Sequence, residues 1–168
     1  KKITSKVKVQ KVDLDTGENI NLSGIKFKIK NLDTNEYICQ NVTYPNLKTI
    51  CEFETGSDGS FTTPQDLFGN YQVEELEQVI PGYNLNKKPI KFTISNETEF
   101  QKNEFNENII VINFPNERIK GNLKINKIGE ELVIEDKITY NKVPLLGVKF
   151  NLYAKENIYL GNKLIIKK

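Results

Sequence analysis

The chain has 168 residues, of which 38% are hydrophobic and 27% charged, a composition that is typical of folded globular proteins and excludes a disordered chain. Its 24 basic and 22 acidic residues nearly cancel, and the basic ones alternate with apolar ones, which indicates solvated strand faces and no nucleic-acid interface. The chain contains no His, the commonest general base and metal ligand, so we expect neither an enzyme nor a metal or cofactor site. No apolar run approaches the roughly 20 residues that cross a bilayer, so we expect no membrane insertion.

Alternation of apolar and polar residues with a period of two predicts β-strands along the chain. The clearest of these strands are expected at residues 6–9, 25–29, 71–73 and 90–94. Short turn sequences such as Asp15-Thr16-Gly17 and Ser57-Asp58-Gly59 separate them, and no segment has the period of an amphipathic helix. Many short strands joined by regular turns predict an all-β sandwich or barrel.

The opening of this pattern occurs twice. Residues 7–11 (Val-Lys-Val-Gln-Lys) recur as residues 123–127 (Leu-Lys-Ile-Asn-Lys), and residues 22–29 recur as residues 145–152. We therefore expect the strands of one domain to begin a second time near residue 120.

The repeat predicts two domains of unequal completeness. Residues 1–117 are expected to form one complete domain, and residues 118–168 the N-terminal part of a second, truncated copy with an insertion at 129–144. Roughly 50 residues seldom form a self-sufficient core, so we expect the second copy to be loosely ordered or to lean on the first.

An ordered set of landmarks runs through the first copy. The landmarks are Lys11-Val12-Asp13-Leu14-Asp15-Thr16-Gly17, Leu22 to Phe27, Ser57 to Phe61, Gly69 to Glu75, Pro81-Gly82-Tyr83 and Ile112-Asn113-Phe114. In this order they resemble the Cna B-type (SpaA-like, prealbumin-like) domains of Gram-positive surface adhesins and pilins. The resemblance covers residues 5–118 and, as opening strands, 120–154. It implies an immunoglobulin-like, prealbumin-like β-sandwich used in tandem, often with a spontaneous isopeptide bond from Lys to Asn or Asp assisted by an acidic residue.

Strand phase predicts three polar side chains in the core. Because side chains alternate between the faces of a strand, Lys11, Glu75 and Asn113 each share a face with two apolar residues before them. Those apolar residues are Val7 and Val9, Tyr71 and Val73, and Ile109 and Val111. Strand phase alone leaves two interpretations open. Either Lys11 forms a covalent bond with Asn113, or Lys11 and Glu75 form a plain salt bridge or extend their charged ends to the rim of the sandwich. Glu77 is an alternative to Glu75 as the acidic residue that assists bond formation.

The covalent interpretation has a definite chemistry. Burial favours the neutral forms of both a Lys and a Glu, so the Lys11 amine would attack the Asn113 side-chain carbonyl while Glu75 supports the oxyanion and carries the proton, and ammonia would leave. Proximity imposed by the fold replaces an enzyme, since well-oriented intramolecular pairs reach effective molarities on the order of 10⁵ M or more. The reaction would occur once per molecule. Lys127, the matching lysine of the second copy, would lack partners and stay unreacted.

The two cysteines, Cys39 and Cys51, flank a predicted hairpin with its turn at Tyr44-Pro45-Asn46. Their separation of 12 places both on one strand face, so a cross-strand disulfide and two buried thiols are both open.

The resemblance implies a structural stalk or spacer of a bacterial surface adhesin or pilin-like protein. Such a module lies outside the cell, at the cell surface or wall, with targeting signals outside this segment and neighbouring repeats of the same protein as partners. The alternative is a module that binds a host protein or carbohydrate and has no internal crosslink. That alternative predicts an exposed aromatic patch, for which Tyr37, Tyr44 and Phe53 are the candidates.

Overall fold

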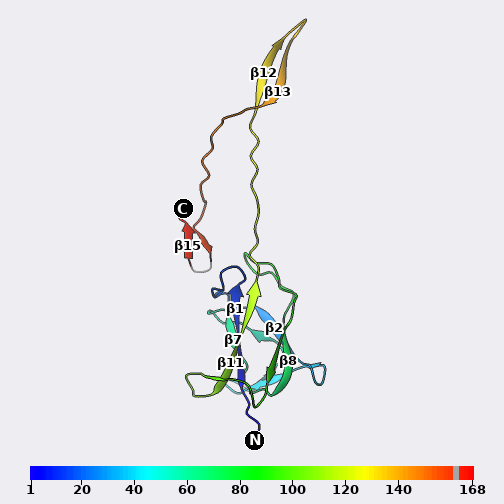
Figure 1. Ribbon diagram of the computed structural model, residues 1–168, viewed down its shortest axis with the longest axis vertical. Coiled ribbons are helices and arrows are strands. Elements are labelled where there is room, and N and C mark those ends of the chain that lie inside the picture. Colours follow the sequence, from blue (N-terminus) through cyan, green and yellow to red (C-terminus); the bar gives the residue numbers. More distant parts are fainter. Residues whose placement is uncertain (161–162) are drawn as a thin grey trace. The chain divides into compact units, whose positions relative to one another are not determined.

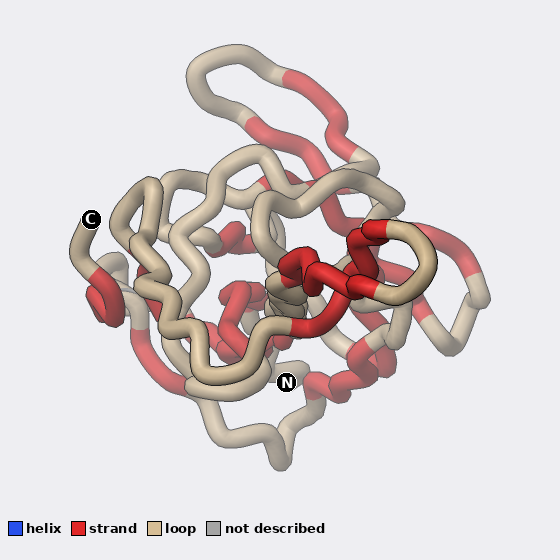
Figure 2. The backbone as a smooth tube through the Cα atoms, turned by 90° about the horizontal axis from the view of Figure 1, so that it is seen from above, coloured by secondary structure: helices blue, strands red, loops and turns tan. Residues whose placement is uncertain are grey.

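The computed structural model describes residues 1–160 and 163–168, and the regular elements in these ranges are all β-strands (Figure 2). The chain divides into two compact units. The first holds residues 1–119 together with Tyr159, Leu160 and Lys163, and the second holds the other described residues from Lys120 onward. The all-β fold class expected from the alternating pattern is confirmed.

Two sheets form the first unit (Figure 1). The first sheet has the strand order β10 (Gln101–Lys102), β11 (Asn108–Asn116), β1 (Lys6–Asp13) and β7 (Ser60–Thr62). The second has the order β3 (Glu36–Tyr37), β2 (Lys26–Asn31), β8 (Gly69–Glu75) and β9 (Ile90–Ile94), with β6 (Phe53–Glu54) also paired to β2. The two sheets pack face to face and enclose a single core.

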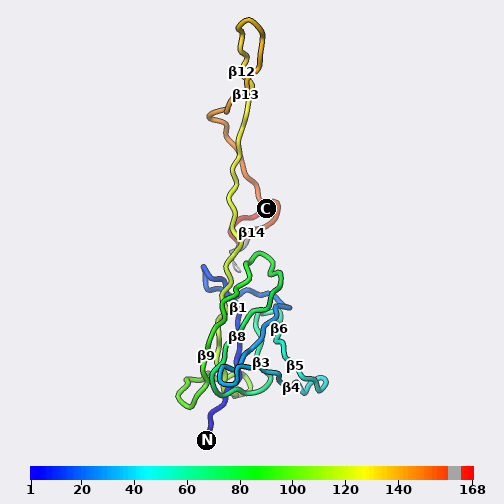
Figure 3. The backbone as a smooth tube through the Cα atoms, turned by 90° about the vertical axis from the view of Figure 1, so that its right-hand side faces the viewer, coloured from blue at the N-terminus to red at the C-terminus, as the bar shows by residue number. Residues whose placement is uncertain are grey.

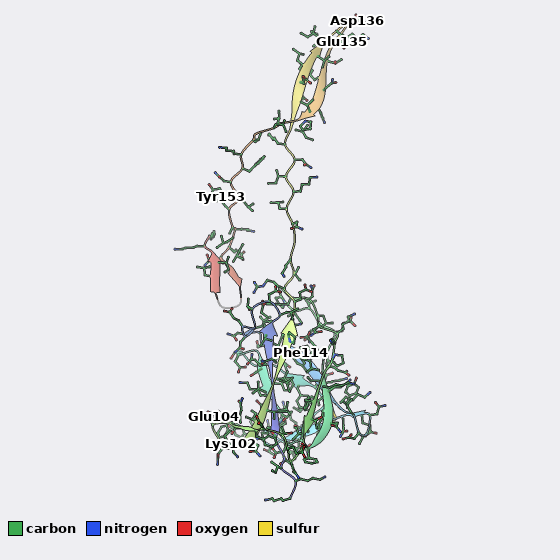
Figure 4. All side chains as sticks on the ribbon, in the orientation of Figure 1. Lys102, Glu104, Phe114, Glu135, Asp136 and Tyr153 are labelled. Atoms are coloured by element: carbon green, nitrogen blue, oxygen red, sulfur yellow. A yellow bond between two sulfur atoms is a disulfide. The ribbon has the colours of Figure 1, made fainter. Side chains whose placement is uncertain are left out.

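Side chains that alternate between the two faces of each strand form that core. Each long strand turns every second side chain inward, as Val7 and Val9 do on β1 and Val73 does on β8. Aromatic rings join the two layers, with Phe27 of β2 and Phe114 of β11 in edge-to-face contact at 5.1 Å between centroids. Figure 4 labels Phe114 among the side chains between the strands. The core therefore depends on strands from both ends of the first unit.

The first and last long strands of the unit, β1 and β11, are neighbours and run parallel along their whole length. Lys6 pairs with Ile109 at one end of the ladder and Asp13 with Asn116 at the other. The chain therefore enters the first unit at one end of this pair of strands and leaves it at the opposite end.

A small hairpin of β4 (Gln40–Val42) and β5 (Lys48–Ile50) carries the two cysteines at its base. A disulfide joins Cys39 and Cys51, one of the two states that the sequence left open. Figure 3 shows the hairpin to the side of the two sheets. The buried Gln40 ties it to the unit, because its side chain donates to the carbonyl of Gln65 and accepts from the N–H of the same residue, each at 3.1 Å.

We predict that replacing both Cys39 and Cys51 by Ser lowers the free energy of unfolding by about 3 kcal/mol, the loop entropy for a crosslink of this span. Urea unfolding of the variant and of the oxidised and reduced wild type measures the effect. The reduced wild type should match the variant, and equal midpoints in the oxidised and reduced wild type would contradict the prediction.

In the second unit, β12 (Ile128–Ile134) and β13 (Ile138–Pro144) form an antiparallel hairpin, with Glu135 and Asp136 at its turn (Figure 4). Near the end of the chain, β14 (Ile158–Leu160) pairs with β15 (Lys163–Ile166). The repeated segments 123–127 and 145–152 were expected to be strands, and this is wrong, because the strands lie in the predicted insertion instead. A strand needs a neighbour for its backbone groups. The described residues of this unit offer these segments no counterpart of β7, β8 or β11.

Candidate functional site

Lys11 lies near the end of β1 and has no solvent-exposed surface. Its backbone N–H donates to the carbonyl of Gly59, at 2.9 Å, in the turn before β7. Gly59 has a φ of +74°, and a Cβ there would lie 1.8 Å from the backbone oxygen of Ile20, so glycine is required. The close approach of this turn helps to hold the lysine backbone in place.

Two side chains from other strands accept hydrogen bonds from the buried amine of Lys11. Nζ of Lys11 donates to Oε1 of Glu75 and to Oδ1 of Asn116, each 2.5 Å away. Glu75 ends β8 and Asn116 ends β11, so three strands from the two sheets meet at this point. The side chains of Lys11 and Glu75 are fully inaccessible to solvent, and buried charges of this kind persist only when they are paired and hydrogen-bonded.

The carboxamide of Asn116 is held in one orientation. Its Nδ2 donates to Oε2 of Glu75 at 2.8 Å and to the backbone carbonyl of Asn84 at 3.0 Å. Because a carbonyl oxygen only accepts, the Asn84 contact requires the amide nitrogen on that side and turns Oδ1 toward Lys11. Among the residues that the structure describes, every buried side-chain nitrogen and oxygen has a hydrogen-bond partner, and this cluster is no exception.

The expectation that Asn113 faces the core beside Lys11 is wrong. Asn113 is exposed and pairs with Gln10 across the ladder, whereas Asn116 is fully buried. The inward face of β11 carries Ile110, Ile112 and Phe114, which is the opposite phase from the predicted one. A shift of one residue moves every side chain to the other face, so Asn116 occupies the position that Asn113 was predicted to occupy.

The surroundings of Lys11 favour a neutral amine. Burial lowers the pKa of Lys11, and the hydrogen bond and negative charge of Glu75 oppose this without cancelling it, so the pKa lies below its ordinary value. The ring of Phe27 faces the amine, with Nζ 5.6 Å from its centroid, and this cation–π contact, like Glu75, favours the charged form. A lysine amine is a nucleophile in its neutral form, and Nζ of Lys11 lies within hydrogen-bond distance of both a carboxamide and a carboxyl group.

The hydrogen bonds of this cluster do not include the other predicted site residues. Glu77, the rival of Glu75, is exposed, and so is Lys127 in the second unit. The three aromatic residues proposed for a ligand patch do not form one. Phe53 is buried, Tyr37 is held by Lys28 and Lys30 and donates to Glu74, and Tyr44 lies at the hairpin tip.

A second buried group adjoins the cluster and was not predicted from the sequence. Asp13, fully buried at the end of β1, accepts hydrogen bonds at Oδ2 from the Tyr83 hydroxyl at 3.0 Å and from Nη2 of Arg118 at 2.9 Å. Its Oδ1 accepts from the backbone N–H groups of Asp15 and Thr16. Because Asp13 pairs with Asn116 in the ladder, this ion pair fastens the chain directly after the candidate site.

Burial opposes ionisation of Asp13, but the hydrogen bonds from Arg118, from the two turn N–H groups and from Tyr83 outweigh it, so the pKa of Asp13 lies below its ordinary value. A lowered folded-state pKa stabilises the fold above the unfolded pKa of about 4, and this contribution is lost as the pH falls below it.

We therefore predict that Asp13→Asn costs about 2 kcal/mol at neutral pH and that the difference from wild type shrinks as the pH falls below about 4. Urea unfolding of both proteins between pH 7 and pH 2 measures this. A constant difference across the range would show that the charge of Asp13 does not stabilise the fold.

Other kinds of site find little support in the described part of the chain. No group of three or more His, Cys, Asp or Glu side chains in it is arranged to hold a metal ion. None of its segments forms a helix long and apolar enough to cross a membrane.

The sequence of this chain matches a known family of domains. The model of the SpaA prealbumin-like fold domain matches residues 5–108, more than half of the chain. No curated protein matches the chain.

Several solved structures are similar. GBS52, the minor pilin of Streptococcus agalactiae, is 17% identical with a TM-score of 0.52, over 75% of this chain and 49% of that one. The full-length major pilin SpaD of Corynebacterium diphtheriae is 19% identical with a TM-score of 0.50, over 70% and 31%. The pilus 2b backbone protein of group B streptococcus is 21% identical with a TM-score of 0.49, over 68% and 41%. The match spans less than half the length of each of these proteins, and at such identities the likeness is one of fold.

Proposed function

The chain belongs to the SpaA family of prealbumin-like fold domains, and from this and the buried cluster we propose that it is a structural stalk module stabilised by an isopeptide bond between Lys11 and Asn116. The observation that carries the proposal is a fully buried lysine whose Nζ is 2.5 Å from the carboxamide oxygen of Asn116 and 2.5 Å from Oε1 of Glu75. The proposed covalent partner of Lys11 is therefore Asn116, in place of the Asn113 expected from the sequence.

The proposed reaction exchanges one amide for another. The neutral Nζ of Lys11 attacks Cγ of Asn116, the new Nζ–Cγ bond forms, and the Cγ–Nδ2 bond breaks. Glu75 contacts both nitrogens, Nζ through Oε1 and Nδ2 through Oε2, so it can accept a proton from the nucleophile and deliver one to the leaving group. The products are the crosslinked chain and ammonia, and Glu75 ends in the state in which it began. The reaction is a single turnover, and the module is not an enzyme.

The position of the bond explains what it would do under load. Lys11 lies near the end of β1 and Asn116 ends β11, 105 positions later. Tension applied to the N-terminal end of the unit would pass along residues 1–11, across the bond, and out through the chain after Asn116. Residues 12–115 would carry no load, and the sandwich would stay folded while the stalk is stretched.

We extend the proposal to location and partners. A module that resists pulling and proteolysis suits an extracellular stalk at the bacterial surface, with neighbouring domains of the same protein or further subunits as partners. The fold that this chain shares with pilins supports that placement.

A second candidate function is adhesion through the β4–β5 hairpin, held by the Cys39–Cys51 disulfide. Near its tip Tyr44 is 85% exposed and Leu47 is 78% exposed, and rigid loops that present aromatic side chains are suited to binding. This candidate does not require a bond at Lys11.

We predict that intact wild-type protein, reduced and unfolded, weighs one ammonia less than its sequence, and that Asn116→Ala and Glu75→Gln restore the full mass. Asn113→Ala is the matched control and should still lose ammonia, because Asn113 is exposed. The bond closes a loop of about 100 residues, so the wild type should exceed Asn116→Ala in stability by about 5 kcal/mol. A wild-type mass equal to that of the sequence would contradict the bond and leave adhesion as the remaining candidate.

A further inference from the structure

The segment that covers the candidate site, residues 82–88 between β8 and β9, is called here the 82–88 strap. Backbone hydrogen bonds tie it to the chain around the end of β11, from Asn84 N–H to the carbonyl of Glu117 at 2.8 Å and from Ile119 N–H to the carbonyl of Gly82 at 2.9 Å. The strap therefore lies beside Asn116 and is held to the chain that follows it.

Asn86 connects the strap to both sides of the reaction centre. Its backbone N–H donates to Oε2 of Glu75 at 2.9 Å, and its side-chain Nδ2 donates to the carbonyl of Pro115, the residue before Asn116, at 2.7 Å. Its Oδ1 accepts from the N–H of Lys88 at 3.0 Å, which closes a turn in the strap. One residue thus contacts the carboxyl group directly and holds the carboxamide through its neighbour.

The hydrogen bonds distinguish the two oxygens of Glu75. Oε2 accepts from two N–H groups, those of Asn86 and Asn116, whereas Oε1 accepts from the amine of Lys11. On the other side, the carbonyl of Asn84 accepts from Nδ2 of Asn116 at 3.0 Å. The strap therefore fixes which atom of each group faces the nucleophile and which faces the leaving nitrogen.

We propose that Asn86 is a positioning residue for isopeptide formation, acting through Glu75 and through the Asn116 carboxamide that the strap orients. The inference rests on the proposed Lys11–Asn116 bond. Without the Asn86 side chain, the strap loses its tie to Pro115, and both the Asn86 N–H and the Asn84 carbonyl shift relative to the reacting groups. Nδ2 would then be turned away from Oε2, so the leaving nitrogen would lack its proton donor.

The test is the rate at which the full chain loses ammonia after synthesis in a cell-free reaction, followed by intact mass of samples quenched in acid. We expect Asn86→Ala to slow this loss by roughly 10- to 100-fold, the effect of a small misplacement of reacting groups. Asn86→Asp keeps the acceptor for Lys88 and removes the donor to Pro115, so it should be slow as well. Circular dichroism of each variant verifies that the chain is folded.

A matched control separates positioning from stability. Thr63 is buried and its Oγ1 accepts from the N–H of Val7 at 2.9 Å, so Thr63→Ala also removes a buried hydrogen bond, but outside the strap. Slow ammonia loss in both Asn86 variants with a wild-type rate in Thr63→Ala supports the inference. A wild-type rate in the Asn86 variants, or equal slowing in Thr63→Ala, overturns it and leaves the bond itself intact. Absence of any ammonia loss in the wild type overturns both.

Discussion

A lysine amine with no access to water sets the constraint on which the rest of the first unit depends. Lys11 is fully buried, and its Nζ finds its partners only where the last residues of β8 and β11 converge on β1. An unpaired buried amine would cost several kcal/mol, so Glu75 and Asn116 stabilise the packing of the two sheets by pairing with it. The polar cluster thereby restricts the relative positions of β1, β8 and β11 more than apolar packing alone would.

The surroundings of this cluster are built to keep it fixed. Gly59 holds the backbone of Lys11 from one side, and the 82–88 strap holds Glu75 and Asn116 from the other. Directly beyond, the ion pair of the buried Asp13 with the partly exposed Arg118 fastens the chain as it leaves the unit. Preorganisation of this kind gives reacting groups a high effective concentration, and it also places the proposed bond where tension would enter and leave the sandwich.

The sequence predicted more of the fold than of the site, and the reasons are physical. Strand alternation correctly placed Lys11 and Glu75 inside, because Val7 and Val9 precede Lys11, and Tyr71 and Val73 precede Glu75, at intervals of two residues. The same reasoning gave the wrong face for β11. Its residues Ile109 to Ile112 are four apolar residues in succession, so alternation does not show which alternate set of side chains faces the core. The strand continues through Pro115, where a proline is tolerated because β10 pairs with β11 only at residues 108 and 109. The strap and the Asp13–Arg118 pair depend on contacts between residues far apart in sequence, which no local pattern reveals.

The proposed bond joins the buried amine of Lys11 to Asn116. Its most direct test is protease digestion of the purified wild-type protein, followed by fragmentation mass spectrometry of the peptide that contains Lys11. We expect a branched peptide in which the Lys11 side chain is joined to that of Asn116, with the loss of one ammonia. An unmodified linear peptide containing Lys11, or a branch at Asn113, would contradict it.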